Sequence, residues 1–267
     1  MCVYFDVRHP GERAAAEQCC AVAASLGRHA VALPVDVPGL GHSHGASALI
    51  GRCVDEVEGL GRLPRCLINA PAEIGSGKDD DSIAPTPMRL ADGDVAPNTD
   101  GGLLLRLNEV NVAPALALSE AFHHAWTLGE MSNGAEDGDR SIINLIDSGT
   151  AEPFLSGLAF VLTQASMRAA TPLLAKAFAP HVRVVGLAAP LLPSIPGLAT
   201  SPSISDALCE AVLFLANAST TTGSILLADG GAQVRRAERQ SGETVDRKSV
   251  ASMSGTAPEI AADPHGE

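Results

Sequence analysis

The sequence contains few aromatic and few basic residues. Phe, Trp and Tyr make up 3% of its 267 residues, and 18 Lys and Arg stand against 31 Asp and Glu, for a formal net charge of −13. Because so acidic a chain repels phosphates, we expect neither nucleic acid nor an anionic membrane as a main partner. The 46% hydrophobic content then predicts a core of Ala, Leu, Val and Ile, as in doubly wound α/β proteins.

The sequence also lacks paired cysteine spacing and long apolar runs. Its six cysteines show neither a zinc pattern nor a compact disulfide framework. His42 and His44 have no third ligand beside them, so no metal site is predicted. No apolar run is long enough to span a bilayer, and Asp6 and Arg8 interrupt the only apolar start, which argues against a signal peptide. We therefore expect a protein of a reducing, cytoplasmic compartment.

Residues 141–190 carry the clearest pattern in the chain. The apolar run 142–146 is too short for an ordinary helix and predicts a buried strand. A helix is predicted from about residue 157 to 179, with a kink or break at Pro172. A second buried strand follows at 182–187 and is closed by Pro190. Strand, helix and strand make one right-handed parallel crossover, the unit of an α/β fold.

Two motifs relate this pattern to a known family. The first strand reads Ser-Ile-Ile-Asn at 141–144 and ends in Asp147, and residues 222–231 read Thr-Gly-Ser-Ile-Leu-Leu-Ala-Asp-Gly-Gly. On these residues the chain resembles the short-chain dehydrogenases/reductases, and within them the pteridine reductases, over about residues 3–231. The resemblance implies a Rossmann-like, doubly wound parallel sheet.

The catalytic positions of that family carry other residues here. Counted from Asp147, the family's Tyr corresponds to Phe160 and its Lys to Gln164. A reductase of this type needs a general acid, and a phenol near its ordinary pKa of about 10 is a poor one at neutral pH unless a neighbour lowers that pKa. In the family the Lys does so. Phe160 has no proton to give and Gln164 has no charge, so the resemblance implies a lost or impaired reaction.

Asp147 matches the Asp with which pteridine reductases assist the Tyr. Without a phenol beside it, this carboxyl can at most bind a pteridine-like ring, or it can cap the following turn next to Ser148. Both interpretations stay open from the sequence.

A dinucleotide site is implied at four further positions. The exit of the second strand of such folds meets the adenosine ribose, where an acid favours NAD and a base favours NADP. Arg8 lies where pteridine reductases carry a basic residue, which favours NADP, whereas Asp6 favours NAD. If any cofactor binds, we expect NADP. Asp36 ends the next strand, Asn69 matches the first residue of the family's Asn-Asn-Ala turn, and Pro190 matches the proline after the sixth strand.

The family's first strand and its Gly-rich phosphate turn have no counterpart in this sequence. Residues 2–5 already resemble the second strand. Since the first strand lies in the middle of the sheet, its loss predicts either two part-sheets with exposed inner edges or direct pairing of the second strand with the fourth. We expect either a shortened version of a longer protein or a degenerate copy.

The remaining segments are predicted more simply. Residues 103–128 read as one long amphipathic helix, in which Asn111 stands three residues before Pro114, one fewer than in the family. The folded domain is expected over residues 1–234 and a disordered polar tail over 235–267.

Three functions follow as hypotheses. The first is a degenerate short-chain dehydrogenase/reductase that is inactive or impaired. The second is an NADPH-dependent reductase of pteridines or related carbonyl and imine compounds that uses Asp147. The third is a structural subunit that completes its sheet with a partner, as a homo- or hetero-oligomer.

Overall fold

The computed structural model describes most of the predicted domain. The described residues are 1–8, 10–58, 64–70, 101–128, 140–148, 158–189 and 202–231. By its internal packing the chain divides into two units, Met1–Asp229 and Gly230–Glu267. The predicted tail at 235–267 lies outside the described residues, so that expectation and the boundary at 234 stay predictions. Everything below concerns the first unit.

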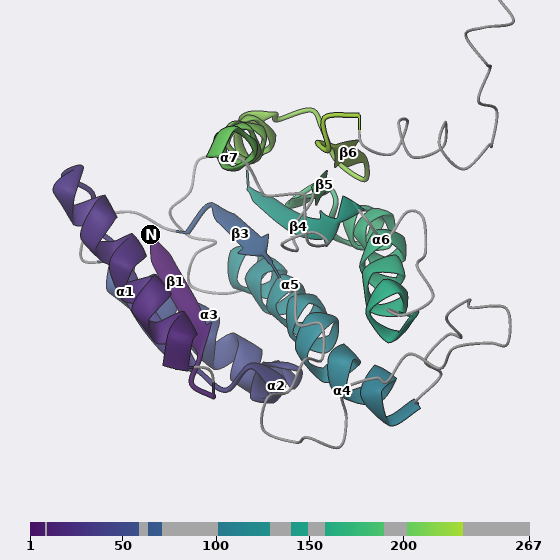
Figure 1. Cartoon of the computed structure of the whole chain (residues 1–267), viewed down its shortest axis with the longest axis horizontal. Helices are drawn as coiled ribbons and strands as arrows, with labels where there is room; N and C mark the ends of the chain where they lie inside the picture. The colour runs from purple at the N-terminus through teal and green to yellow at the C-terminus, as the bar shows by residue number, and fades with distance from the viewer. Residues whose placement is uncertain are drawn as a thin grey trace, which may run out of the picture. The chain divides into compact units, whose positions relative to one another are not determined.

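Strands and helices alternate along this unit (Figure 1). The first half contains β1 (Cys2–Asp6), α1 (Pro10–Ser25), β2 (Val31–Val35), α2 (Val37–Leu40), α3 (Ser43–Glu58) and β3 (Cys66–Asn69). The second half contains α4 (Gly101–Asn111), α5 (Ala113–Thr127), β4 (Ser141–Asp147), α6 (Leu158–Phe178), β5 (Arg183–Ala189), α7 (Pro202–Asn217) and β6 (Ile225–Leu227). None of these helices combines the length and the hydropathy that a membrane span requires.

The strands form two parallel sheets rather than one. β1 pairs with β2, and β3, β4, β5 and β6 pair in that order. The predicted Rossmann-like α/β class is confirmed, because every ladder is parallel and helices connect the strands. Of the two outcomes predicted from the missing strand, the described part of the chain has the two part-sheets, because β1 does not pair with β3 there.

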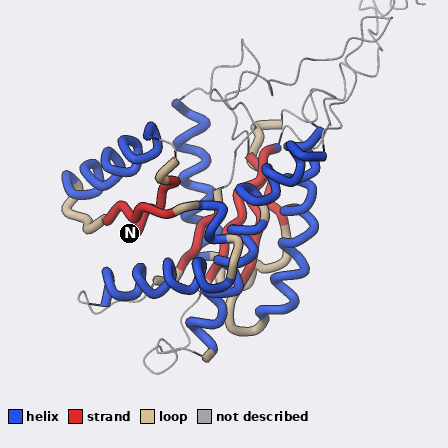
Figure 2. Tube along the Cα trace, turned by 90° about the horizontal axis from the view of Figure 1, so that it is seen from below, coloured by secondary structure: helices blue, strands red, loops and turns tan. Residues whose placement is uncertain are grey.

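One hydrophobic cluster joins the two sheets. It contains Leu33 of β2, Leu49 of α3, Phe122 of α5, Ile142 of β4 and Val184 of β5. The opposite face of the larger sheet packs on α7 through Ile143, Val185, Leu187 and Leu215. Figure 2 shows helices on both sides of these strands. Successive residues of a strand point to opposite faces of the sheet, so each strand supplies apolar side chains to a core on both faces. This is expected of a parallel sheet that helices cover on both sides.

A buried arginine fixes the end of α7. The guanidinium of Arg183, at the start of β5, donates hydrogen bonds of 3.0–3.3 Å to the carbonyl oxygens of Leu215, Ala216 and Thr221. A helix leaves its last carbonyls without intrahelical partners, and a cation there is favoured by the helix dipole. Arg183 therefore caps the helix that covers one face of the sheet.

The structure decides two helix predictions. The single helix expected over residues 103–128 is two helices, and the second begins after Val112 with Pro114 in its first turn. A proline has no N–H to continue the helix before it and disfavours helical backbone at the preceding residue, so the chain restarts there. Of the kink or break predicted at Pro172, the break does not occur, because α6 continues through Pro172 as one helix. The buried residues Met167, Thr171 and Ala175 on both sides of Pro172 hold that helix against the sheet.

Gly186 gives a direct test of the register between β5 and β6. A Cβ at this position would lie 2.8 Å from Cγ1 and 3.3 Å from Cβ of Ile225. We expect Gly186→Ala to lower the free energy of unfolding by about 2 kcal/mol, because a stiff β-branched side chain cannot move aside. Gly51→Ala is the matched control. A Cβ added at Gly51, inside α3, would have no atom within 4 Å, so this variant should raise the free energy of unfolding by about 0.5 kcal/mol. Urea denaturation of both variants measures the difference, and equal stabilities would contradict the register.

Candidate functional site

Four of the predicted site residues lie at the carboxyl ends of the parallel strands. Arg8 follows β1, Asp36 follows β2, Asn69 ends β3 and Asp147 ends β4. In open α/β sheets ligands bind at this edge. Pro190 lies directly after β5, outside the described residues, so its predicted part in the site stays a prediction.

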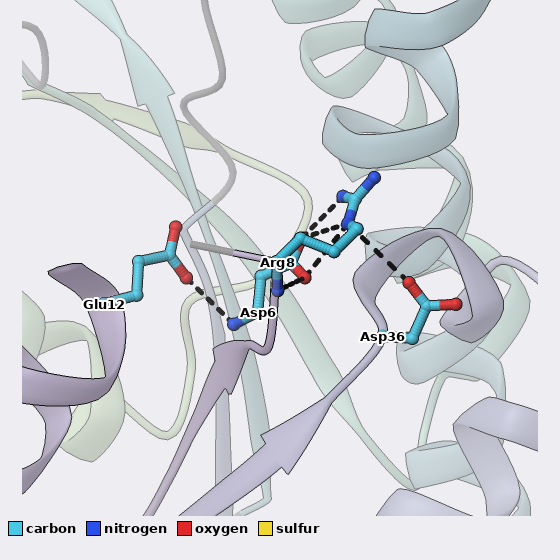
Figure 3. Close-up of polar contacts among 4 residues, drawn as sticks. All are labelled: Asp6, Arg8, Glu12 and Asp36. Carbon is cyan, nitrogen blue, oxygen red and sulfur yellow. Dashed lines mark hydrogen bonds and ion pairs between the residues drawn. The ribbon is translucent and has the colours of Figure 1, made fainter. Parts of the chain in front are cut away.

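The structure places Arg8 between two carboxylates (Figure 3). Its Nε lies 3.1 and 3.0 Å from the two carboxylate oxygens of Asp6 and 3.7 Å from Oδ1 of Asp36. The Asp6 side chain is only 3% exposed, whereas that of Arg8 is 45% exposed. The backbone N–H of Arg8 also donates to Asp6 Oδ1, at 3.0 Å. The local fold thus holds the guanidinium through Asp6.

A third carboxylate belongs to the same group. Glu12, in the first turn of α1, accepts a hydrogen bond of 2.9 Å from the backbone N–H of Asp6. One guanidinium is thus shared by two carboxylates, Asp6 and Asp36, and a phosphate of NADP would compete with both of them. The residues described at this end of the sheet do not fit a dinucleotide phosphate.

Asn69 forms a buried connection between β3, β4 and α5. Its Nδ2 lies 2.9 Å from Asn144 Oδ1, 3.1 Å from Ser119 Oγ and 3.4 Å from the carbonyl oxygen of Ala115. Asn144 in turn donates to Thr171 Oγ1 of α6, at 3.1 Å. A buried polar group is costly unless it is bonded, so this network fixes the two strands and the two helices relative to one another.

One acceptor in this network remains unused. Asn69 is 0% exposed, and its Oδ1 has no hydrogen-bond partner in the described structure. Leaving a buried acceptor unbonded costs about 1–3 kcal/mol. Such a group is uncommon, because buried polar atoms in folded proteins usually have a partner.

The position of the family's Lys is part of the core. Gln164 is 0% exposed, and its Oε1 accepts the backbone N–H of Asp147 at 2.9 Å. This hydrogen bond ties α6 to the end of β4. The glutamine therefore has a structural contact at the place where the family resemblance implied a cation.

The position of the family's Tyr is equally buried. Phe160 is 3% exposed and packs with Leu103 and Leu107 of α4 and with Ala159. Close by, Asn111 donates to Thr163 Oγ1 at 3.3 Å and so also joins α4 to α6. Neither Phe160 nor Gln164 can transfer a proton, and both hold the helix in place.

A cavity of about 470 Å³ separates the two sheets. Its walls come from all five residues of β1, from the end of β3, from single positions on α1, α2 and α4, and from two positions on α5; they include Tyr4, Phe5, Ile68, Asn69, Val110 and Ala115. Most of these side chains are apolar. The unused Oδ1 belongs to one of the residues that line this cavity.

Tyr4 is the single tyrosine of the chain. Burial, and to a lesser extent Cys53 and Glu12, raise its pKa to about 12. A phenol of this pKa is a weaker acid than an ordinary tyrosine. Tyr4 lies on β1, in the smaller sheet, whereas Asp147 ends β4 in the larger one.

Several residues of this region were not predicted to have a function. Glu12, Ser119 and Thr171 gave no signal because each reads as an ordinary helix residue. Asn144 did carry one, since it is a polar residue inside the apolar run of a predicted buried strand. A buried polar side chain needs hydrogen-bond partners. In the structure the partners of Asn144 are Asn69 and Thr171.

Solved structures of known proteins resemble this fold. FolM alternative dihydrofolate reductase 1 from Brucella suis, in complex with NADP, is 18% identical, with a TM-score of 0.60 over 87% of this chain and 84% of that chain. Acetoin dehydrogenase from Enterobacter cloacae is 19% identical, with a TM-score of 0.60 over 87% and 85%. A short chain dehydrogenase from Mycobacterium smegmatis is 18% identical, with a TM-score of 0.59 over 85% and 80%.

Sequence comparison gives a shorter match. The protein named ketoacyl reductase 2 of the granaticin polyketide synthase from Streptomyces violaceoruber is 29% identical over 132 residues, 40% of this chain and 50% of that protein. The chain therefore spans about half the length of the curated relative that it matches. No family model matches the chain. Sheet topology and structural likeness together show that the chain has the fold of the short-chain dehydrogenases/reductases.

Proposed function

We propose that this protein is a degenerate member of the short-chain dehydrogenases/reductases, related to the pteridine reductases, that no longer catalyses reduction. The observation that carries the proposal is the burial of Phe160 and Gln164 at the positions of the family's Tyr and Lys. A reductase site at the end of β4 needs a proton donor and a cation there, and the chain has an aromatic ring and a bonded amide in their place.

No other phenol can take over this reaction. The single tyrosine of the chain, Tyr4, belongs to the other sheet, and its pKa of about 12 makes it a poor acid at neutral pH. The acid in the alternative function, a reductase of pteridines or related carbonyl and imine compounds, would be Asp147. That residue is 4% exposed, and a pteridine-like molecule would have to reach it at the edge of the sheet.

We further propose that the chain forms an oligomer through the far edge of its larger sheet. Leu226 and Leu227 of β6 are 40% and 45% exposed, and Leu213 and Phe214 of α7 are 63% and 60% exposed. Clustered apolar side chains of this size commonly mark contacts between proteins. Binding and assembly would then be the remaining functions of the fold.

Restoring the two family residues should not restore activity. In the variant Phe160→Tyr, Gln164→Lys, the ammonium enters a fully buried position and the acceptor of the Asp147 N–H is lost. We expect the unfolding free energy to fall by about 3 kcal/mol and no NADPH-dependent reduction of a dihydropterin. Gln164→Met, which loses the acceptor without adding charge, should cost only about 1–2 kcal/mol.

The comparison needs folded protein, which circular dichroism establishes for each variant. Phe160→Tyr alone controls for the added hydroxyl. Turnover by the double variant, or by the unchanged chain, would contradict the proposal of an inactive protein and favour the reductase.

Calorimetric titration with NADPH tests the cofactor site independently. Because Asp6 and Asp36 already pair with Arg8, we expect no heat of binding at micromolar concentrations of the unchanged chain. Micromolar binding that disappears in Arg8→Ala would show that a phosphate site exists at the end of β1, and the reductase function would then be favoured.

A further inference from the structure

The edge of β1 that faces away from β2 presents backbone hydrogen-bonding groups. In a parallel pair, alternate residues of a strand bond to one neighbour and the residues between them bond to the other side. The Met1 carbonyl accepts the N–H of Val31, and the N–H of Val7 donates to the Val35 carbonyl. The odd-numbered residues of β1 thus bond to β2, so the peptide groups of Tyr4 point toward the cavity.

The edge of β3 shows the same pattern from the other side. The Arg65 carbonyl accepts the N–H of Ser141, so the odd-numbered residues of β3 bond to β4. The peptide groups of Ile68 consequently point away from β4. Ile68 lines the cavity together with the whole of β1, and β2, α3 and β3 form a strand, helix and strand crossover that makes β3 parallel to β2.

Two parallel strand edges therefore face one cavity of about 470 Å³. We call the space between them, lined by Cys2–Asp6 and by Ile68, Asn69 and Ala70, the strand slot. Asn69 lines the strand slot, but its Oδ1 is fully buried and does not face this space. Backbone edges on both sides of the slot are the groups to which a central strand would bond.

We propose that the strand slot binds an extended apolar segment of another polypeptide chain, which inserts as a parallel strand between β1 and β3. The lengths of these strands, five and four residues, set the length of the inserted segment. The insertion would join the two sheets into one by strand addition, in which main-chain hydrogen bonds give affinity and side-chain pockets give specificity. It does not depend on whether the protein is a reductase.

The walls of the strand slot define the chemistry of the segment. Val3, Phe5 and Ile68 favour β-branched or aliphatic side chains, and the carboxylates of Asp6 and Glu12 at one end disfavour acidic ones. A proline is excluded, because a central strand donates hydrogen bonds on both sides. The segment that fits is short, aliphatic and without acidic residues.

Binding of a synthetic strand to the full chain tests the proposal. The probe is the peptide acetyl-Lys-Thr-Val-Ala-Ile-Val-Thr-Lys-amide, and its control has the same side chains but N-methylated amides at alternate residues. We expect the probe to bind with a micromolar dissociation constant. The affinity of the control should be at least about tenfold lower, because its N-methylated amides cannot donate hydrogen bonds to one of the two strand edges. Amide hydrogen exchange at Tyr4 and Ile68 should slow on binding of the probe.

A matched pair of variants at Ile68 separates the backbone from the side chain. Ile68→Pro removes an N–H that points into the strand slot and leaves the hydrogen bonds to β4 in place, and the Ile68 side chain is 40% exposed. It should weaken probe binding by about tenfold, whereas Ile68→Ala, which keeps the N–H, should weaken it by no more than about threefold. Thermal unfolding of each free variant shows whether the fold is intact.

Three results would overturn the proposal. They are no binding of the probe to the unchanged chain, equal binding of the N-methylated control, and exchange at Tyr4 and Ile68 that already slows with protein concentration when no peptide is present. The third result would mean that a second copy of this chain fills the strand slot. If Ile68→Pro does not fold, the comparison of the two peptides on the unchanged chain still decides.

Discussion

The packing of α3 against α5 is the contact on which this structure depends. In the described chain no ladder joins β1 to β3, so backbone hydrogen bonds do not hold the smaller sheet to the larger one. The shared cluster of Leu49, Phe122, Ile142 and Val184 does so instead. Apolar packing is not directional, and it keeps the two halves of the fold together while the space between the strand edges stays open.

The polar interior follows from the same arrangement. Asn69 bonds to α5 and to Asn144, and Asn144 bonds to α6. These contacts fix β3 as a rigid edge beside the cavity. On the other side, Glu12 accepts the N–H of Asp6 and so satisfies one peptide group at the end of β1. Both strands are therefore held in place although no ladder joins them in the described chain.

Chemistry and scaffold have separated in this fold. The end of β4 keeps the Asp147 of the family resemblance, but Gln164 now binds its backbone and Phe160 packs against α4. Both side chains hold α6 in place, whereas an unpaired lysine at the buried position of Gln164 would be costly. The two positions that the family resemblance assigns to catalysis are thus packing positions in this chain.

Much of the fold was predictable from local patterns. The apolar runs at 142–146 and 182–187 predicted β4 and β5, since a short buried run can be satisfied only in a sheet. The strand missing by the family resemblance left two outcomes open, two part-sheets or direct pairing of β1 with β3, and the structure has the two part-sheets in its described residues. The break at Val112 was missed because the apolar spacing continues across it and only Pro114 signals the restart of the helix. The sequence left a kink or a break at Pro172 open, and the break does not occur, because packing of the residues on both sides keeps α6 continuous.

The site was predictable as a set of positions but not as a set of contacts. The sequence alone determined that Phe160 and Gln164 cannot catalyse, because this depends on their chemical groups and not on their surroundings. Only the tertiary structure decided that Arg8 is held by Asp6 and Asp36, that Asn69 keeps an unused acceptor, and that a cavity lies between β1 and β3. Each of these facts depends on groups far apart in the chain, whose distances and burial are set by the packing of the whole unit.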